Sequence, residues 1–379
     1  MILCYIITIM IPVSEPIIAK NAQKYLMECL NSGWVSSKGP FVEKFEDSFA
    51  HYIGTKYAIA CSSGTAALHL SLAALRIGPF DEVIIPTLTM IATALPIIYC
   101  QATPVLVDSE EITGNIDVSE IEAKITKRTK AIIVVHLNGH PADLTPILTL
   151  AKKYKLPVIE DAAESPGAEY KFNGVWKKIG SIGDLGCFSF YGNKIITTGE
   201  GGMVVTNNKA LAMRVKSLRN LARSEKKHFY HQEIAFAYRM SSLQAALGLA
   251  QLEEVQKFIK IKEKLASIYL NNLGGLSNLR LPSEKPGVKR IYWNFDILLK
   301  NHKKRDQLAK FLEKSGIESR IFVTPMHLQP VFKTLGLFKS EQYPISEDLS
   351  SRGLSLPLGL KIKKEEINLI SKLICQVLL

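Results

Sequence analysis

The chain of 379 residues lacks most features of secreted, disordered and membrane-spanning proteins. Its six cysteines are scattered, with no C-x-x-C pair, and several lie in apolar runs where a free thiol behaves as a small hydrophobic side chain. We therefore expect a reducing, cytoplasmic compartment. No Pro/Gly-rich or low-complexity tract is present, and the hydrophobic fraction of 47% and charged fraction of 22% are those of an ordinary globular protein.

Long hydrophobic runs are also scarce. The opening MILCYIITIMIPVSEP is apolar for about twelve residues, whereas a membrane-spanning helix needs about twenty. It lacks the basic n-region and the small-residue cleavage site of a secretory signal. We expect no membrane partner, and a start of translation at Met10 is an alternative explanation for the first residues.

Acidic residues are fewer than basic ones, which gives a net charge of +12. The lysines form no run or basic stripe with interleaved aromatic residues, so we expect no nucleic-acid partner. A smaller anion, such as a nucleotide diphosphate, fits the same charge. His136 and His140 suggest a metal site, but an Asn-Gly turn separates them and no further ligands cluster nearby, so we expect a structural pair and no metal.

Short β-branched runs alternate with helical patterns between residues 57 and 206. Near-continuous apolar strands separated by helices predict a mostly parallel sheet covered on both faces, which is an α/β architecture. The seven runs are YAIAC, EVIIP, TPVLVD, KAIIVVH, LPVIED, GCFSF and GGMVVT.

The pattern becomes helical after Asn207. A stretch at 241–270 begins with Ser and contains no Pro, as a connecting helix would. Strand-like WNFDILL and ESRIFV, a helix near 304–315 and an amphipathic helix near 364–378 then predict a smaller α+β unit. We expect a large α/β domain at 1–250, including the N-terminal segment, and a small C-terminal domain at 251–379.

Ligands in open α/β sheets collect beyond the carboxyl ends of the strands. At the first such place, CSSGTAALHLSLAAL, a strand runs through Ser-Gly-Thr into a helix. The free N–H groups of Gly64, Thr65 and Ala66, together with the helix dipole, suit a phosphate. A simple Ser/Thr N-cap is the alternative interpretation.

The second place is VIEDAAES, where Asp161 ends an apolar strand. A buried aspartate is costly unless it meets a cation or a charge-assisted donor, and a protonated pyridine nitrogen would satisfy it. An N-cap for the next helix is the alternative.

At the third place, CFSFYGNKIITTGEGG, Ser189 is followed by Lys194. An amine near apolar surroundings and other cations has a lowered pKa, as an imine-forming lysine requires, although a lone loop lysine is usually solvated.

A phosphate cradle, a strand-end aspartate and a later lysine are the parts that a pyridoxal phosphate site needs. With segments such as SGWVSSKGPFVEKFE, VHLNGHPADL and YRMSSLQAALGLAQLE, the chain resembles the DegT/DnrJ/EryC1/StrS sugar-nucleotide aminotransferases over nearly its whole length. The resemblance implies the fold-type I pyridoxal-phosphate-dependent aminotransferase architecture, with a mostly parallel seven-stranded sheet and a smaller C-terminal α+β domain.

The resemblance also implies roles for individual residues. Lys194 would form the Schiff base with the cofactor, and Asp161 would pair with its pyridine nitrogen. Glu164 would lie near the phenolic oxygen, and Met90 would take the place over the ring that relatives often give to an aromatic residue. The phosphate would be held by Gly64, Thr65, Ala66 and Ser189.

The family uses a homodimer with shared active sites, and FYHQEIAFAYRMS matches the segment that crosses over. His231 and Arg239 are therefore candidates to complete the partner's site, and Arg320 and His327 are candidate contacts to the nucleotide sugar. Two departures concern Ala237, where relatives often carry Asn, and Pro166, where those acting on a GDP-linked sugar tend to carry a larger residue.

The nearest members aminate C4 of a GDP-linked 4-keto-6-deoxymannose with glutamate as donor, to make deoxyamino sugars for surface polysaccharides. A UDP- or dTDP-linked keto sugar aminated at C3 or C4 stays open, as does a catalytically idle regulator that binds the cofactor. A hairpin at KFNGVWKKIGSIGD, with a tight Asn173-Gly174 turn, is expected to be a structural flap, with a substrate lid as the alternative.

Overall fold

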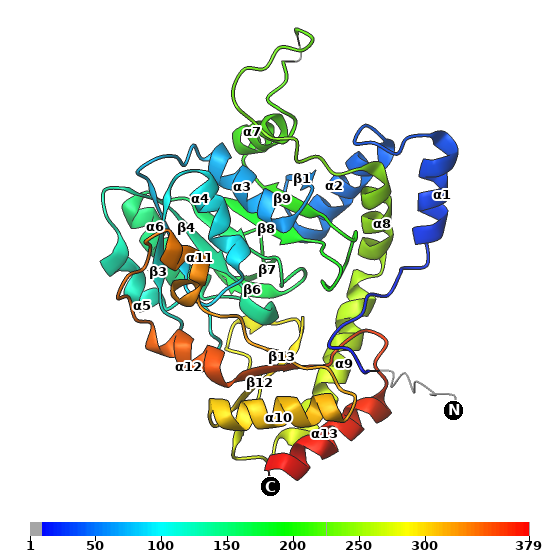
Figure 1. Cartoon of the computed structure of the whole chain (residues 1–379). Coiled ribbons are helices and arrows are strands. Elements are labelled where there is room, and N and C mark those ends of the chain that lie inside the picture. Colours follow the sequence, from blue (N-terminus) through cyan, green and yellow to red (C-terminus); the bar gives the residue numbers. More distant parts are fainter. Residues whose placement is uncertain (1–9, 225, 379) are drawn as a thin grey trace, which may run out of the picture.

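A seven-stranded sheet forms the centre of the computed structural model, which describes residues 10–224 and 226–378 (Figure 1). The order is β1-β9-β8-β5-β4-β2-β3, and only β9 runs antiparallel to its neighbours. All seven predicted strands are present, so the expected sheet is confirmed. They are β1 (Tyr57–Cys61), β2 (Glu82–Pro86), β3 (Thr103–Val107), β4 (Thr129–Val135), β5 (Val158–Asp161), β8 (Leu185–Ser189) and β9 (Gly202–Thr206).

Helices cover both faces of this sheet, which explains why its strands are apolar almost without interruption. Along β4, Ile132 and Val134 pack into one helical layer, whereas Ala131 and Ile133 pack into the other. The first layer contains α1 (Ala22–Ser32), α2 (Pro40–Ile53), α6 (Leu144–Tyr154) and α8 (Ser242–Glu253). The second contains α3 (Gly64–Ala74), α4 (Leu95–Tyr99) and α7 (Lys209–Arg219), and the short α5 (Val118–Ile121) precedes β4.

The predicted connecting helix begins as expected but is broken in the middle. Ser241 caps it through a capping box with Gln244. The chain leaves helical geometry at Glu254 and continues as α9 (Val255–Leu273). The Glu254 carboxylate accepts the backbone N–H of Lys20 at 2.8 Å, a contact from the other end of the chain that no local sequence signal indicates.

The C-terminal part has its own antiparallel sheet, in the order β10-β12-β14-β13, and its own core. The first half of α9 packs into the large core through Phe258, whereas the second half packs into the small core through Tyr269. We retain the division near residue 250 as a proposal. The elements are β10 (Leu279–Arg280), β12 (Phe295–Leu299), α10 (His302–Lys314), β13 (Arg320–Ile321), α11 (Pro330–Thr334), α12 (Pro344–Arg352), β14 (Gly353–Leu356) and α13 (Lys364–Leu378).

The N-terminal segment, which we grouped with the large domain, makes contacts with the smaller one. Ile11 pairs with Ile317 as an isolated bridge, and the N–H of Leu358 donates to the carbonyl of Val13 at 2.9 Å. The expectations for residues 1–9 lie outside the described residues. Between residues 10 and 378, no described helix is both long and apolar enough to cross a membrane.

The predicted hairpin is formed by β6 (Glu169–Phe172) and β7 (Val175–Lys178). Asn173 and Gly174 have φ values of 50° and 80°, as a tight two-residue hairpin turn requires. The hairpin adds β11 (Val288–Lys289) as a third strand, and the Lys289 ammonium lies 4.2 Å from the centroid of the Trp176 ring. Trp176 does not line the candidate site described below, which favours the structural flap.

Candidate active site

A cavity of about 410 Å³ lies beyond the carboxyl ends of the sheet strands. Its walls come from the large sheet, from the segment around Trp293 and from β13, so both parts of the molecule contribute. Eight of the sequence-predicted residues line it: Gly64, Thr65, Met90, Asp161, Glu164, Ser189, Lys194 and Arg320.

The beginning of α3 forms one end of this cavity. Ser63 caps the helix, and its hydroxyl accepts the N–H of Ala66 at 3.0 Å. The expectation that this N–H is free is therefore wrong, whereas the N–H groups of Gly64 and Thr65 have no partner among the described residues. A Cβ atom at position 64 would lie 2.8 Å from Cβ of Ser189. Glycine therefore lets the start of α3 approach Ser189 closely, which places the free N–H groups beside the Ser189 hydroxyl at one end of the cavity.

Asp161 lies at the end of β5 with 6% of its surface exposed. The Thr93 hydroxyl donates to Oδ2 at 3.0 Å, and the N–H of Ala163 donates to Oδ1 at 3.2 Å. Burial raises the pKa of this carboxyl group despite these two donors and the nearby Lys194. A cation placed against Asp161 would relieve that cost.

Lys194 reaches the same cavity with 9% of its side chain exposed. Its ammonium lies 3.7 Å from Oε1 of Glu164 and 3.8 Å from the centroid of the Trp293 ring. Burial lowers the pKa of Lys194, and the carboxylates of Glu164 and Asp161 oppose this shift. The lowered pKa and its cause, the apolar surroundings, are as expected, whereas the described charges that act on this amine are carboxylates and not the cations that we also expected.

Glu164 is held by a strained piece of backbone. Its Oε2 accepts the N–H of Asn138 at 2.8 Å, and Asn138 has a φ of 52°. Arg290 donates to the carbonyl of the same residue at 3.1 Å. Burial raises the pKa of the Glu164 carboxyl group, and Lys194 opposes that shift.

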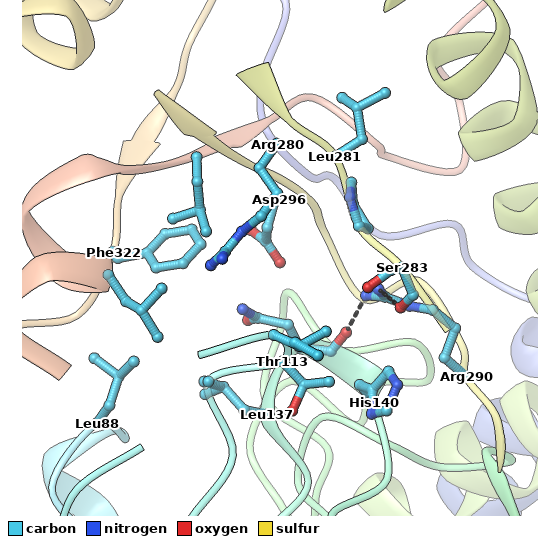
Figure 2. Close-up of a pocket in the computed structure, with 16 residues that line it drawn as sticks. Leu88, Thr113, Leu137, His140, Arg280, Leu281, Ser283, Arg290, Asp296 and Phe322 are labelled. Atoms are coloured by element: carbon cyan, nitrogen blue, oxygen red, sulfur yellow. Dashed lines mark hydrogen bonds between the residues drawn. The ribbon is translucent and has the colours of Figure 1, made fainter. Parts of the chain in front are cut away.

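A second, smaller cavity of about 50 Å³ adjoins the first and shares Leu137 and Asn138 with it. Figure 2 shows Arg280, Arg290 and Asp296 around it. Burial raises the pKa of Asp296 to about 6, although the Ser355 hydroxyl donates to Oδ1. Because Ser355 lines the larger cavity, it connects the two.

Sequence reasoning missed three contributors to the cavity. The Trp293 ring packs against Lys194, and its Nε1–H donates to the carbonyl of Asn193 at 2.9 Å. Oδ1 of Asn193 is buried and has no partner among the described residues. Thr93 orients Asp161. Asn193 stands directly before Lys194 and could have been suspected, but no local signal links Trp293 or Thr93 to the lysine.

Three predicted substrate contacts lie elsewhere. His231 and Arg239 line a separate pocket and do not line the Lys194 cavity of their own chain. His327 is buried, and its ring nitrogens bond to Thr87 Oγ1 at 2.9 Å and to Glu347 Oε1 at 3.0 Å. The expected contact of His327 with a nucleotide sugar is therefore not supported, since both nitrogens are already used.

The predicted structural histidine pair is present. His136 accepts the N–H of Ala142 at one ring nitrogen, so its other nitrogen donates to Glu160 at 3.1 Å. His140 accepts the N–H of Lys285. Among the described residues, no group of three or more His, Cys, Asp or Glu side chains could hold a metal ion.

A parallel sheet with an anion cradle, a buried acid and a buried amine at its carboxyl edge defines a pyridoxal-phosphate-dependent aminotransferase of fold type I. The chain belongs to the DegT/DnrJ/EryC1/StrS aminotransferase family, whose model matches residues 16–374.

Relatives and solved structures extend over nearly the whole chain. The GDP-perosamine synthase of Caulobacter vibrioides is 43% identical and the match covers 97% of this chain and 98% of the relative. That of Escherichia coli O157:H7 is also 43% identical, over 94% of this chain and 95% of the relative. The Streptococcus pneumoniae protein Spr1654, solved in a PLP form, has a TM-score of 0.91 at 27% identity and covers 97% of this chain and 98% of that one.

The residues present fit this cofactor. The free N–H groups of Gly64 and Thr65 and the Ser189 hydroxyl lie at one end of the cavity and suit the phosphate. Asp161 is a buried carboxyl group, and a protonated ring nitrogen against it would stabilise its charged form. Met90 lines the cavity and offers a sulfur contact where an aromatic side chain would stack.

Proposed function

We propose that the protein transfers an amino group from glutamate to C4 of GDP-4-keto-6-deoxymannose and so produces GDP-perosamine, a deoxyamino sugar for polysaccharide synthesis. The convergence of Asp161 and Lys194 on one cavity beside the start of α3 carries the proposal. The GDP-perosamine synthases at 43% identity favour this sugar over other nucleotide-linked sugars. The described cysteines are free thiols, which suits a reaction in the cytoplasm.

The chain's own residues perform three tasks in this reaction. When bound, pyridoxal phosphate supplies an electron sink for the negative charge that develops on a substrate carbon. The Asp161 carboxylate keeps a proton on the ring nitrogen. The Lys194 amine takes the proton from the α-carbon of glutamate, and in the second half of the cycle it returns a proton to C4 of the sugar.

The surroundings of Lys194 support this role. Its lowered pKa places more of the amine in the neutral, basic form at working pH than a solvated lysine would have. Glu164, 3.7 Å away, holds the amine in position. The Trp293 ring covers the amine on another side and keeps water from it. Arg320 also lines the cavity and is exposed, which supports the proposal that it contacts the nucleotide sugar.

Replacement of Lys194 tests the proposal directly. Lys194→Ala removes the only amine that we assign to the cofactor's aldehyde, so we expect loss of the visible absorbance of the lysine-bound cofactor and of steady turnover. Absorbance spectra and an assay of 2-oxoglutarate formation measure the two effects. Retention of both would contradict the assignment.

The sugar is tested with a panel of nucleotide-linked keto sugars. We expect the wild-type protein to aminate GDP-4-keto-6-deoxymannose at C4 with ping-pong kinetics, because both substrates use one site in turn. Amination of a UDP- or dTDP-linked sugar alone, or at C3, would replace the proposed substrate and leave the reaction type standing. Absence of any spectral change with glutamate would favour a regulator that binds the cofactor without catalysis.

We also propose a homodimer with shared active sites. The segment that contains His231 and Arg239 projects from the body of the molecule between α7 and α8 (Figure 1). Its side chains Phe229 and Ile234 are 84% and 94% exposed. Large apolar side chains that lie open to solvent are typical of a surface that another chain covers.

A further inference from the structure

The small cavity that adjoins the Lys194 cavity lies between the two parts of the molecule (Figure 2). Gly114 and Asn138 line it from the side of the large sheet, and Arg280, Arg290 and Asp296 line it from the C-terminal part. Its volume of about 50 Å³ has room for a few water molecules, because each needs about 10–15 Å³. We call it the Asp296 cavity.

Two buried polar atoms of the side chains that line this cavity have no hydrogen-bond partner among the described residues. They are Oδ2 of Asp296 and Nε of Arg290. Asp296 is 9% exposed and Arg290 is 8% exposed, so bulk water does not serve either atom. An unpaired buried donor or acceptor is costly, whereas a water molecule can accept from a guanidinium N–H and donate to a carboxylate. The Asp296 cavity is therefore suited to water that bridges these two side chains.

Arg290 connects the Asp296 cavity with Lys194 through three contacts. Its Nη2 donates to the carbonyl of Asn138 at 3.1 Å, and the Asn138 N–H donates to Oε2 of Glu164 at 2.8 Å. Oε1 of Glu164 then lies 3.7 Å from the Lys194 ammonium. Because Asn138 has a φ of 52°, in the left-handed region that costs free energy for a residue with a side chain, this turn depends on such contacts to keep its shape.

The charges along this path alternate in sign. Asp296 and Glu164 are acidic, whereas Arg290 and Lys194 are basic. Asp296, Glu164 and Arg290 are buried, and 9% of the Lys194 side chain is exposed. Arg290 favours the charged form of Asp296, and Glu164 disfavours it. The two carboxyl groups therefore act on each other although the Asn138 turn separates them, and a change of charge at Asp296 affects Glu164.

We propose that Asp296 is a positioning residue for the reaction: paired with Arg290 through water in the Asp296 cavity, it keeps the Asn138 turn and Glu164 in place against Lys194. The proposal rests on the proposed function, because Lys194 is the amine whose position it sets. Loss of the negative charge at Asp296 removes a counter-charge from the buried Arg290 guanidinium, so we expect Arg290 to hold the turn less firmly.

Protonation of Asp296 removes the same charge. Burial raises the pKa of Asp296 to about 6, and the Ser355 hydroxyl, which donates to Oδ1, opposes this shift. Burial lowers the pKa of His140 to about 4, so this imidazole is neutral at neutral pH, and arginine stays charged throughout. The charged and titratable side chains around Asp296 and Arg290 are Arg280, Arg290, His140, Glu164 and Glu284.

Asp296→Asn in the holoenzyme tests the proposal by turnover and by the absorbance of the lysine-bound cofactor, both measured from pH 5 to 9. At pH 8 we expect kcat to fall about ten- to hundredfold, because a small displacement of the reacting amine is costly. The KM of the sugar should change less than about threefold, since Asp296 does not line the Lys194 cavity. The pH at which the absorbance changes should fall by about half a unit, because a negative charge that favours the protonated form is lost.

The pH profile separates positioning from a purely structural role. Wild-type kcat should fall as the pH drops from 7 to 5, when Asp296 takes up a proton, and Asp296→Asn should lack this fall. Asp296→Glu keeps the charge and should keep the fall. Ser355→Ala removes a donor that lowers the pKa of Asp296, so it should move the fall to higher pH, and it keeps the test decisive if Asp296→Asn does not fold. Asp306→Asn is the matched control, because Asp306 is an exposed acid of the C-terminal part outside both cavities, and it should follow the wild type.

Three outcomes separate the role of Asp296 from the proposed reaction. Wild-type kcat and an unchanged absorbance titration in Asp296→Asn would overturn the positioning role even if the keto sugar is aminated. A lower melting temperature of Asp296→Asn, with a pH profile and an absorbance titration that parallel those of the wild type, would show a structural role alone and overturn it as well. The expected shift of the absorbance titration, without amination of any sugar by the wild type, would support the positioning role and sink the proposed function alone.

Discussion

The burial of Asp161 disfavours its charged form and also suits this side chain to its proposed pairing with the ring nitrogen of the cofactor. It ends an apolar strand, and the sheet and α3 shield it from water. Burial raises its pKa although Thr93 and Ala163 donate to it. A positive charge on the cofactor ring would therefore favour the ionised carboxylate and be stabilised by it in turn.

Asp161→Asn tests this pairing. The amide keeps the shape and can accept from Thr93 or from Ala163 but not from both, and it cannot hold a proton on the ring nitrogen, so we expect turnover to fall about 100- to 1000-fold. Cofactor content, measured by absorbance after gel filtration, should fall much less, because in our proposal Gly64, Thr65 and Ser189 hold the phosphate. Thr93→Val is the comparison, since it removes a donor and leaves the charge. Turnover of Asp161→Asn within a factor of three of wild type would contradict the assignment.

Single residues also mark the limits of sequence reasoning. Lys194, Asp161 and Gly64 could be placed in one site because each follows a strand of the same parallel sheet. The role of Ala66 could not be placed, because a helix N-terminus serves equally well as a capped end and as an anion site. His327 has two competing partners, Thr87 and Glu347, that lie far from it in the sequence.

At the scale of elements, α9 connects the two cores and carries a buried charge. Lys262 is fully buried in this helix, and its ammonium donates to the carbonyls of Trp293 at 2.9 Å and Leu358 at 2.7 Å. Burial lowers the pKa of Lys262 to about 7. The Trp293 ring packs against Lys194. The hydrogen bond from Lys262 to the Trp293 carbonyl therefore connects α9 with the segment that contacts the active-site amine.

The lowered pKa predicts a pH-dependent stability. Between pH 7 and about 10 the unfolded chain holds a proton that folded Lys262 has lost, so this group makes the free energy of unfolding rise with pH in that window. Below pH 7 Lys262 is protonated in both the folded and the unfolded state, so the full free-energy cost of burying its charge is present. We expect the wild type to gain stability over Lys262→Met as pH rises from 7 to 9, measured by urea unfolding at each pH. Parallel curves for the two proteins would contradict a buried, titrating Lys262.

The break between α8 and α9 is a second lesson at this scale. Both halves have good helical sequence, and the capping box at Ser241 was visible in the Ser start. The break depends on Glu254, which accepts the N–H of Lys20. Local propensity predicts where helices form, but a contact across the chain decides where they bend.

At the scale of the whole molecule, the two predicted halves of a shared site lie on different surfaces of one chain. Lys194 and Asp161 line one cavity, whereas His231 and Arg239 line a separate pocket. The projecting segment extends away from its own body in Figure 1. In the proposed dimer, the projecting segment of each chain would bring His231 and Arg239 to the Lys194 cavity of the other chain.

Subunit complementation tests that arrangement. Lys194→Ala and Arg239→Ala chains are produced together, and turnover is measured below the KM of the sugar. If the segment acts on the partner, one site of each mixed dimer has both residues intact, and random pairing restores about a quarter of wild-type turnover. Lys194→Ala with Asp161→Asn is the control, because both residues lie in the same cavity and every site keeps a defect. Recovery no greater than that of the control would show that the segment serves its own chain.

The sequence by itself determined the seven-stranded sheet, its parallel character and the cluster of functional residues at its carboxyl edge. It could do so because apolar strands and the residues that follow them are local patterns with a fixed geometric meaning. Only the tertiary structure decided that Trp293 covers Lys194, that Arg290 braces the backbone beside Glu164, and that five Lys and Arg side chains line one pocket beside the projecting segment. These contacts join segments distant in the chain, so their formation depends on how whole elements pack and not on any local pattern.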